Sequence, residues 1–250
     1  MKLGRIVTMV IFTPYFSVMA NSFFRFKQFT VYHNQCAMKV GTDGVLLGAW
    51  TKCDTSGNIL DIGTGSGLIA LMLAQRTRAT INAIDIDKGA YEQAKLNFSE
   101  SPFSDRLRIY HTSLQDFHPG NTYNLLVSNP PFFTNSLKSP DSQRNTARHD
   151  DSLSLDSLFS HARRLLSPDG RFCLIVPVKQ EESINQIARK NQLHLKHKTI
   201  VFPTPNSKPR RTLLEYLPKQ ETYIEDQIII EIARHQYSDE FKQLTKEYYL

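Results

Sequence analysis

The chain has 250 residues, of which 40% are hydrophobic and 22% charged, with 11 glycines and 12 prolines. This composition excludes a disordered chain and a fibrous repeat, and the length suits one α/β domain with at most a modest appendage. The net charge of +6 favours acidic partners such as nucleic acid, although charge alone does not select one.

The first 22 residues have the composition of an N-terminal extension. Two basic residues precede an apolar stretch that imitates a short signal peptide, but Pro14 interrupts it and it is too short for a membrane span. Regular patterning begins just after Met19, which offers a downstream start. We therefore interpret residues 1–22 as an extension, with residues 1–18 spurious, and expect no membrane segment.

The three cysteines, Cys36, Cys53 and Cys173, lie far apart and show no Cys-x-x-Cys spacing. This argues against a zinc knuckle and against a disulfide framework. Free thiols in a reducing compartment are the simplest reading, so we expect a cytoplasmic protein without a metal. The sequence does not determine the oligomeric state, and a monomer is the default expectation.

Strand-like and helix-like stretches alternate along most of the chain, which is typical of a doubly wound α/β fold with a mostly parallel sheet. An antiparallel pair of strands around a proline-rich segment is expected at the C-terminal edge of the sheet. We expect a cap at residues 23–57 and one domain over residues 58–250. Strands are predicted at 59–62, 81–85, 107–111, 123–128, 171–176, 195–202, 212–217 and 228–232. Helices are predicted at 68–76, 88–98 and 153–166, and a last helix is predicted between the final strand and Tyr248.

A glycine-rich loop follows the first predicted strand of this domain. Residues 60–67 read LDIGTGSG, with glycines at Gly63, Gly65 and Gly67. The spacing differs from the Gly-x-Gly-x-x-Gly of dinucleotide-binding loops. It resembles motif I of the class I methyltransferases, which implies a Rossmann-like fold and a loop that packs against the methionine part of S-adenosyl-L-methionine. Asp61 can order this loop or reach the ammonium group of the cofactor through water.

Further cofactor contacts are expected after the next two strands. Asp85 stands at a strand end, where a carboxylate can accept hydrogen bonds from ribose hydroxyls, whereas Asp87 can simply cap the following helix. Ser113 and Leu114 occupy the position where relatives contact the adenine, often with an acidic residue. Ser113 departs from that pattern, because serine stands where an acidic residue is common.

The segment SNPPFF at residues 128–133 follows the fourth strand and resembles the signature of methyltransferases that act on amide or exocyclic amine nitrogens. The N6 amine of adenine is a poor nucleophile because its lone pair is delocalised. The Asn129 side-chain oxygen and the Pro130 carbonyl can accept its two N–H groups and so aim the lone pair at the methyl group. Phe132 can stack on a flipped base. Asn129 is also expected to contact the cofactor.

Three further segments resemble the bacterial tRNA1(Val) (adenine-37) N6-methyltransferase family. They are FKQF at 26–29 with MKVGTDGVLLGAW at 38–50, ARH at 147–149, and the end of the chain from YSDEF at 237–241 through YYL at 248–250. The resemblance covers roughly residues 23–250. It implies transfer of a methyl group from S-adenosyl-L-methionine to N6 of adenine 37 in tRNA(Val). It also implies that Lys39, Thr42, Asp43 and Gly44 line the cofactor or target pocket.

Basic residues supply candidate RNA contacts. Between residues 189 and 211 there are seven Lys or Arg and no acidic residue, a stripe that can neutralise phosphates around a flipped base. The predicted contacts are Lys138, Arg144, Arg148, Lys208, Arg210 and Arg211.

Two other activities share parts of this pattern and stay open. Protein glutamine N5-methyltransferases carry a related Asn-Pro-Pro-aromatic loop, and guanine N2 methylation of rRNA is a third option. An NAD-dependent oxidoreductase is disfavoured by the glycine spacing. A non-catalytic RNA-binding module is disfavoured because the glycine loop and Asn129 are both intact.

Overall fold

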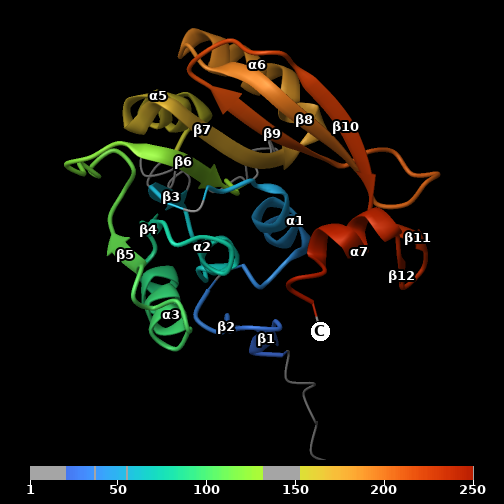
Figure 1. Cartoon of the computed structure of the whole chain (residues 1–250), viewed down its shortest axis with the longest axis horizontal. Helices are drawn as coiled ribbons and strands as arrows, with labels where there is room; N and C mark the ends of the chain where they lie inside the picture. Colours follow the sequence, from blue (N-terminus) through green and yellow to red (C-terminus); the bar gives the residue numbers. More distant parts are fainter. Residues whose placement is uncertain (1–20, 37, 55, 132–152, 250) are drawn as a thin grey trace, which may run out of the picture.

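The computed structural model describes residues 21–36, 38–54, 56–131 and 153–249. Its central feature is one large sheet, whose strands run in the order β10-β8-β9-β7-β6-β3-β4-β5 (Figure 1). The strands are β3 (Asn58–Ile62), β4 (Thr80–Asp85), β5 (Leu107–His111), β6 (Tyr123–Ser128), β7 (Leu166–Pro177), β8 (His194–Phe202), β9 (Arg211–Leu217) and β10 (Ile224–Ile229).

The strands from β3 to β7 pair in parallel, whereas β9 pairs antiparallel with both β7 and β8. The predicted doubly wound sheet with an antiparallel C-terminal edge is confirmed. The carboxyl ends of β3, β4 and β6 meet at one edge, which is where open α/β sheets bind ligands. The same edge carries the end of β8 and the start of β9.

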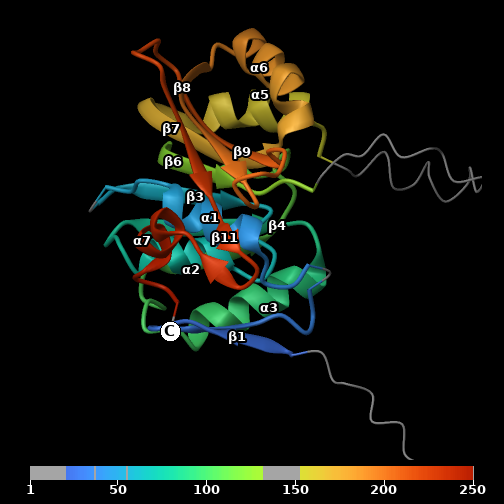
Figure 2. The same ribbon diagram turned by 90° about the vertical axis from the view of Figure 1, so that its right-hand side faces the viewer.

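Helices cover both faces of the sheet (Figures 1 and 2). Two separate cores result because alternate residues of a strand point to opposite faces: Cys173 and Ile175 of β7 belong to one core, and Leu174 and Val176 to the other. One face carries α5 (Leu155–Leu165) and α6 (Glu181–Lys190), and the other carries α1 (Thr42–Trp50), α2 (Leu68–Ala74), α3 (Lys88–Ser99) and α7 (Asp239–Thr245).

Two glycines let α1 approach α2 closely. A Cβ on Gly48 would lie 2.7 Å from the Met72 sulfur, and one on Gly44 would lie 2.9 Å from Cδ2 of Leu68. Larger residues at these positions would push the helices apart. The contact places the start of α1 beside the glycine-rich loop from which α2 begins.

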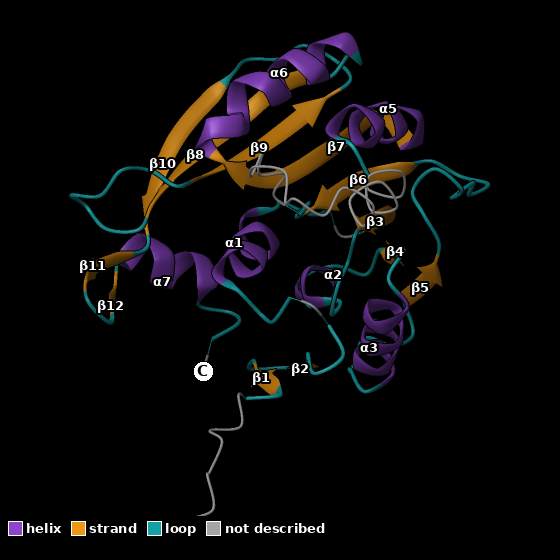
Figure 3. Cartoon of the chain, turned by 180° about the vertical axis from the view of Figure 1, so that it is seen from behind, coloured by secondary structure: helices purple, strands orange, loops and turns teal. Residues whose placement is uncertain are grey.

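Several elements differ from the prediction. The strand predicted at 228–232 has the wrong bounds, because β10 begins at Ile224 and ends at Ile229. A hairpin of β11 (Glu231–Ala233) and β12 (Gln236–Tyr237) follows it and lies beside α7, which ends at Thr245 (Figure 3). Helices α1 and α6 and the hairpin of β1 (Phe23–Arg25) and β2 (Thr30–Tyr32) were not predicted as elements.

The described part of the chain contains no helix long and apolar enough to cross a membrane. Most of the extension predicted at residues 1–22 lies outside the described residues, which begin at Asn21.

Candidate functional site

A cavity of about 340 Å³ opens at the carboxyl edge of the sheet. It brings together three segments far apart in the sequence: the cap before β3, the glycine-rich loop after β3, and the start of the loop after β6. Its walls are Met38, Lys39, Gly41, Thr42, Asp43, Gly44, Gly63, Thr64, Gly65, Ser66, Leu68, Ile69, Asn129, Pro130 and Pro131.

The glycine-rich loop has a backbone that favours glycine. Gly63 and Gly65 have φ values of +69° and +58°, and a Cβ on either would meet no atom of the described residues within 4 Å. Gly67, with φ of +82°, precedes α2, and a Cβ there would lie 2.5 Å from the Phe98 ring. Gly63 and Gly65 thus present bare backbone to the cavity, while Gly67 is needed for packing.

Asp61 organises this loop from within the protein. Its Oδ2 accepts hydrogen bonds from the Thr64 hydroxyl at 2.6 Å and from the Ala70 amide at 3.2 Å. Its Oδ1 is buried and has no hydrogen-bond partner among the described residues. Burial raises the pKa of Asp61 to about 7, although the two hydrogen bonds oppose the shift. Asp61 therefore orders the loop, but it is fully buried and does not line the cavity, and its contact with the cofactor stays a prediction.

Asp85 is also engaged by the backbone. Its Oδ2 accepts from the Gly65 amide and its Oδ1 from the Asp87 amide, both at 2.9 Å. Burial raises the pKa of the Asp85 carboxyl above its ordinary value. Asp87 caps α3 by accepting from the Ala90 amide at 2.8 Å, as the sequence indicated. Asp85 thus links the glycine-rich loop to the end of β4, and the ribose contact stays a prediction.

Asn129 follows β6 directly and lines the cavity. The Ser128 hydroxyl donates to the Ile62 carbonyl at 3.0 Å and fixes the ends of β6 and β3 together. The side-chain oxygen of Asn129 is buried and has no hydrogen-bond partner among the described residues. An unpaired buried acceptor is costly, and such atoms are found where a ligand donates. Phe132 lies outside the described residues.

The cap is held on the glycine-rich loop by a residue that the sequence did not single out. Asn97 of α3 is fully buried; it accepts from the Tyr32 amide at 3.0 Å and donates to the carbonyls of Tyr32 and Ser66, both at 2.8 Å. The cap supplies Lys39, Thr42, Asp43 and Gly44 to the cavity wall. Their contact with a cofactor or target stays a prediction.

Ser113 and Leu114 are not on this cavity wall. The Ser113 hydroxyl donates to the Asp116 carboxylate at 2.7 Å and accepts from the Asp116 amide at 3.1 Å, which closes a local turn. The Leu114 side chain is buried in the core. Their backbone can still contact an adenine, so the predicted cofactor contacts of these two residues stay untested.

The basic stripe is not one continuous cationic surface, because acidic residues from other segments pair with part of it. Lys196 pairs with Glu221, Lys198 with Glu181, and Arg211 with Asp43. Lys208 and Arg210 are exposed on the loop between β8 and β9. The other predicted RNA contacts, Lys138, Arg144 and Arg148, lie outside the described residues.

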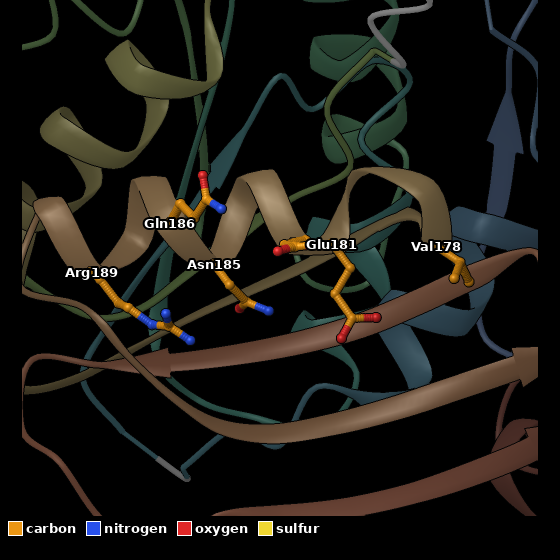
Figure 4. A pocket seen from close by; sticks show the side chains of 6 residues that line it. Val178, Glu181, Asn185, Gln186 and Arg189 are labelled. Carbon is orange, nitrogen blue, oxygen red and sulfur yellow. The ribbon is translucent and has the colours of Figure 1, made fainter.

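A second cavity, of about 360 Å³, lies along α6 and shares no residue with the first (Figure 4). Its polar side chains hold α6 on the sheet: Asn185 accepts from the Tyr216 hydroxyl at 2.6 Å, and Glu181 accepts from the Thr212 hydroxyl at 3.2 Å. We therefore interpret this cavity as a result of how α6 packs on the sheet and not as a binding site. Within the described residues, no three His, Cys, Asp or Glu side chains are grouped to hold a metal ion.

Residues 37–198 match the family described as the methyltransferase small domain. A tRNA1(Val) (adenine(37)-N6)-methyltransferase of Parabacteroides distasonis is 49% identical over 240 residues, covering 93% of this chain and 99% of that protein. Proteins of the same name from Phocaeicola vulgatus and Flavobacterium psychrophilum are 50% and 46% identical, covering 93% and 91% of this chain and 99% of each relative.

Solved structures show the same fold at low sequence identity. A predicted O-methyltransferase from Agrobacterium tumefaciens superposes with a TM-score of 0.65 at 16% identity, covering 82% of this chain and 96% of its own. The glycopeptide N-methyltransferase MtfA, solved with S-adenosyl-L-methionine, has a TM-score of 0.51 at 12% identity, covering 73% and 90%. These two similarities support the fold alone.

Proposed function

The chain belongs to the family of tRNA1(Val) (adenine(37)-N6)-methyltransferases, and from this premise we propose that it transfers a methyl group from S-adenosyl-L-methionine to N6 of adenine 37 in tRNA1(Val). It is an S-adenosylmethionine-dependent methyltransferase. One observation carries the proposal. Asn129, whose side-chain oxygen has no partner among the described residues, lines the same cavity as the bare backbone of Gly63 and Gly65.

The residues present suit this cofactor. The backbone of Gly63 and Gly65 lets a ligand approach more closely than any side chain would allow. Asp61 is fully buried and orders the glycine-rich loop, so it can reach the ammonium group only through water, whereas Asp85 at the end of β4 suits the ribose hydroxyls. When bound, the cofactor supplies a methyl group that is already activated on a sulfonium, so neither a metal nor a covalent intermediate is required.

Asn129 and Pro130 then act on the acceptor. The Asn129 side-chain oxygen and the Pro130 carbonyl accept the two N–H groups of the adenine amine, which draws the nitrogen out of conjugation. The lone pair is thereby oriented for attack, and orientation of this kind accounts for much of the rate of such transfers. Pro130 and Pro131 stiffen the loop and carry no amide hydrogen that would compete for these acceptors.

The RNA is proposed to approach over the loop between β8 and β9. Lys208 and Arg210 are exposed on this loop, which leaves the same edge of the sheet as the cavity. Their charges can neutralise phosphates on either side of a flipped base. With tRNA as substrate, we propose a cytoplasmic enzyme that acts as a monomer.

The decisive experiment is transfer from radiolabelled S-adenosyl-L-methionine to tRNA that lacks its native modifications, followed by nucleoside analysis. The expected product is N6-methyladenosine, located at position 37 by digestion of tRNA1(Val). A protein fraction and rRNA are offered in parallel reactions. Unlabelled tRNA together with label in a protein glutamine or in guanine of rRNA would keep the methyltransferase and overturn the substrate.

A further inference from the structure

A small aromatic cavity of about 190 Å³ adjoins the main cavity. Thr42, the first residue of α1, lines both cavities, so the two share a wall residue. The aromatic cavity is further lined by Thr204 of the β8–β9 loop, by Glu231 and Tyr237 of the β11–β12 hairpin, and by the C-terminal Tyr249. None of these four residues was among the predicted contacts.

The ring of Tyr237 is held in place yet available to a ligand. Its side chain is 42% exposed, although it packs on Phe241 with ring centroids 4.9 Å apart. The Tyr249 ring lies 6.5 Å away and nearly parallel, at 19°. Phe241 is fully buried and anchors this cluster on α7, beside the hairpin (Figure 3). A preorganised, partly exposed aromatic ring is the usual platform for an unpaired base.

The polar groups around the ring also suit a base. Glu231 pairs in register with Tyr237 across the hairpin, and its carboxylate can accept a hydrogen bond from an amino or imino group of a base. A carboxylate would instead repel a phosphate inside the cavity. Lys208 and Arg210 are not among the residues that line the cavity. They are exposed on the same loop, directly after a turn that Thr204 and Ser207 close.

We propose that the aromatic cavity binds the unpaired base next to the target adenine, stacked on Tyr237 and hydrogen-bonded to Glu231, while Lys208 and Arg210 contact the adjoining phosphates. This inference rests on the proposed function, since it requires an RNA target adenine in the main cavity. The base bound in the aromatic cavity and the target adenine are neighbours in one RNA strand. Binding of that base therefore determines which adenine of the loop enters the main cavity.

The test is a thermodynamic cycle between the protein and the RNA. Tyr237→Ala is compared with wild type on an anticodon-loop hairpin and on two hairpins in which the base on one or the other side of the target is abasic. Loss of the stacking face should raise KM and the dissociation constant about 5- to 100-fold with little change in kcat. On one of the abasic hairpins, wild type and Tyr237→Ala should become equal.

Two control variants separate recognition from folding. Tyr237→Phe keeps the ring and should bind like wild type, and Ile232→Ala, at an exposed position of the same hairpin, should change nothing. Equal effects of Tyr237→Ala on all three hairpins, or none, would overturn the base site while wild-type transfer upholds the proposed function. A wild-type protein that methylates no tRNA would overturn both.

Discussion

The Nε atom of Arg211 donates to Oδ2 of Asp43 at 2.8 Å, so the first residue of β9 is tied to the first turn of α1. Asp43 lies on the wall of the main cavity. The sequence suggested Arg211 as an RNA contact, but a protein carboxylate already engages its guanidinium group. Arg210, one residue earlier, is exposed on the β8–β9 loop. The two neighbouring arginines should therefore behave differently.

Arg210→Ala is expected to weaken tRNA binding and to reduce the slope of log affinity against log salt by about 0.7 to 0.9, the value for one lost phosphate contact. Arg211→Ala should change this slope less and should instead lower the free energy of unfolding by up to about 1 kcal/mol, because it removes a partly exposed ion pair. Filter binding over a salt series and urea unfolding measure the two effects. Equal slope changes in the two variants would contradict the distinction.

Asn129→Ala should abolish most of the transfer and weaken cofactor binding much less, because the expected cofactor contact of Asn129 is one of many along the cavity wall. Loss of the acceptor for the amine N–H should lower kcat by about 100-fold or more, by analogy with the removal of one preorganised hydrogen-bond group. Asn121→Ala, on an exposed loop, is the matched control and should keep full activity. Calorimetry with S-adenosyl-L-methionine gives the affinity. A large loss of affinity in Asn129→Ala would show that this side chain serves mainly to hold the cofactor and not the target amine.

Asp85→Ala should weaken cofactor binding about tenfold or more, since it removes both the expected ribose acceptor and the hydrogen bond from the Gly65 amide. Asp87→Ala removes only the cap of α3 and should cost about 1 kcal/mol of stability with a smaller change in affinity. The pair is compared by calorimetry and thermal unfolding. If Asp87→Ala loses more affinity than Asp85→Ala, the assignment of the ribose contact is wrong.

Asn97→Ala should destabilise the protein and loosen the cofactor site together. The change leaves the buried polar groups of Tyr32 and Ser66 without partners, which should lower the free energy of unfolding by about 2–4 kcal/mol. The cap and the glycine-rich loop both line the main cavity, so affinity for the cofactor should fall even where the variant is fully folded. Asn191→Ala, at the end of α6, is the control. Unchanged affinity in folded Asn97→Ala would make Asn97 a purely structural residue.

The sequence predicts the elements that are encoded locally. The strands from β3 to β6 match within one residue, because short apolar runs between turn residues mark buried strands. Helix α6 was not predicted, because only Ile184 and Ala188 of this segment are buried and its two ends are charged. The pairing of Arg211 with Asp43 spans 168 positions and depends on the fold, so no local pattern indicates it.

The residues of the site divide in the same way. The glycine-rich loop and Asn129 carry recognisable spacing, and the structure brings both to one cavity. Asn97 lies inside a helix, where an asparagine is not part of any recognisable motif. Tyr237 lies on a hairpin of two very short strands. Their roles become visible only when the partners, which come from distant segments, are in place.

Asp61 should make stability depend on pH. Its native pKa of about 7 lies above the ordinary value of 3.8 expected in the unfolded chain, because burial disfavours the charged form. The native state therefore holds the proton more tightly between these values. The contribution of Asp61 to the free energy of unfolding should be greatest below about pH 4, fall as the pH rises to about 7, and stay constant above it.

Asp61→Asn isolates this contribution, because the amide oxygen can still accept from the Thr64 hydroxyl and the Ala70 amide but the side chain no longer ionises. Relative to wild type, the variant should gain stability as the pH rises from 5 to 8, by on the order of a few kcal/mol at about 1.4 kcal/mol per unit of pKa shift. Urea unfolding of both proteins at several pH values measures the difference. A difference that does not vary with pH would mean that Asp61 ionises normally in the native protein, and its unpaired oxygen would then have to be solvated.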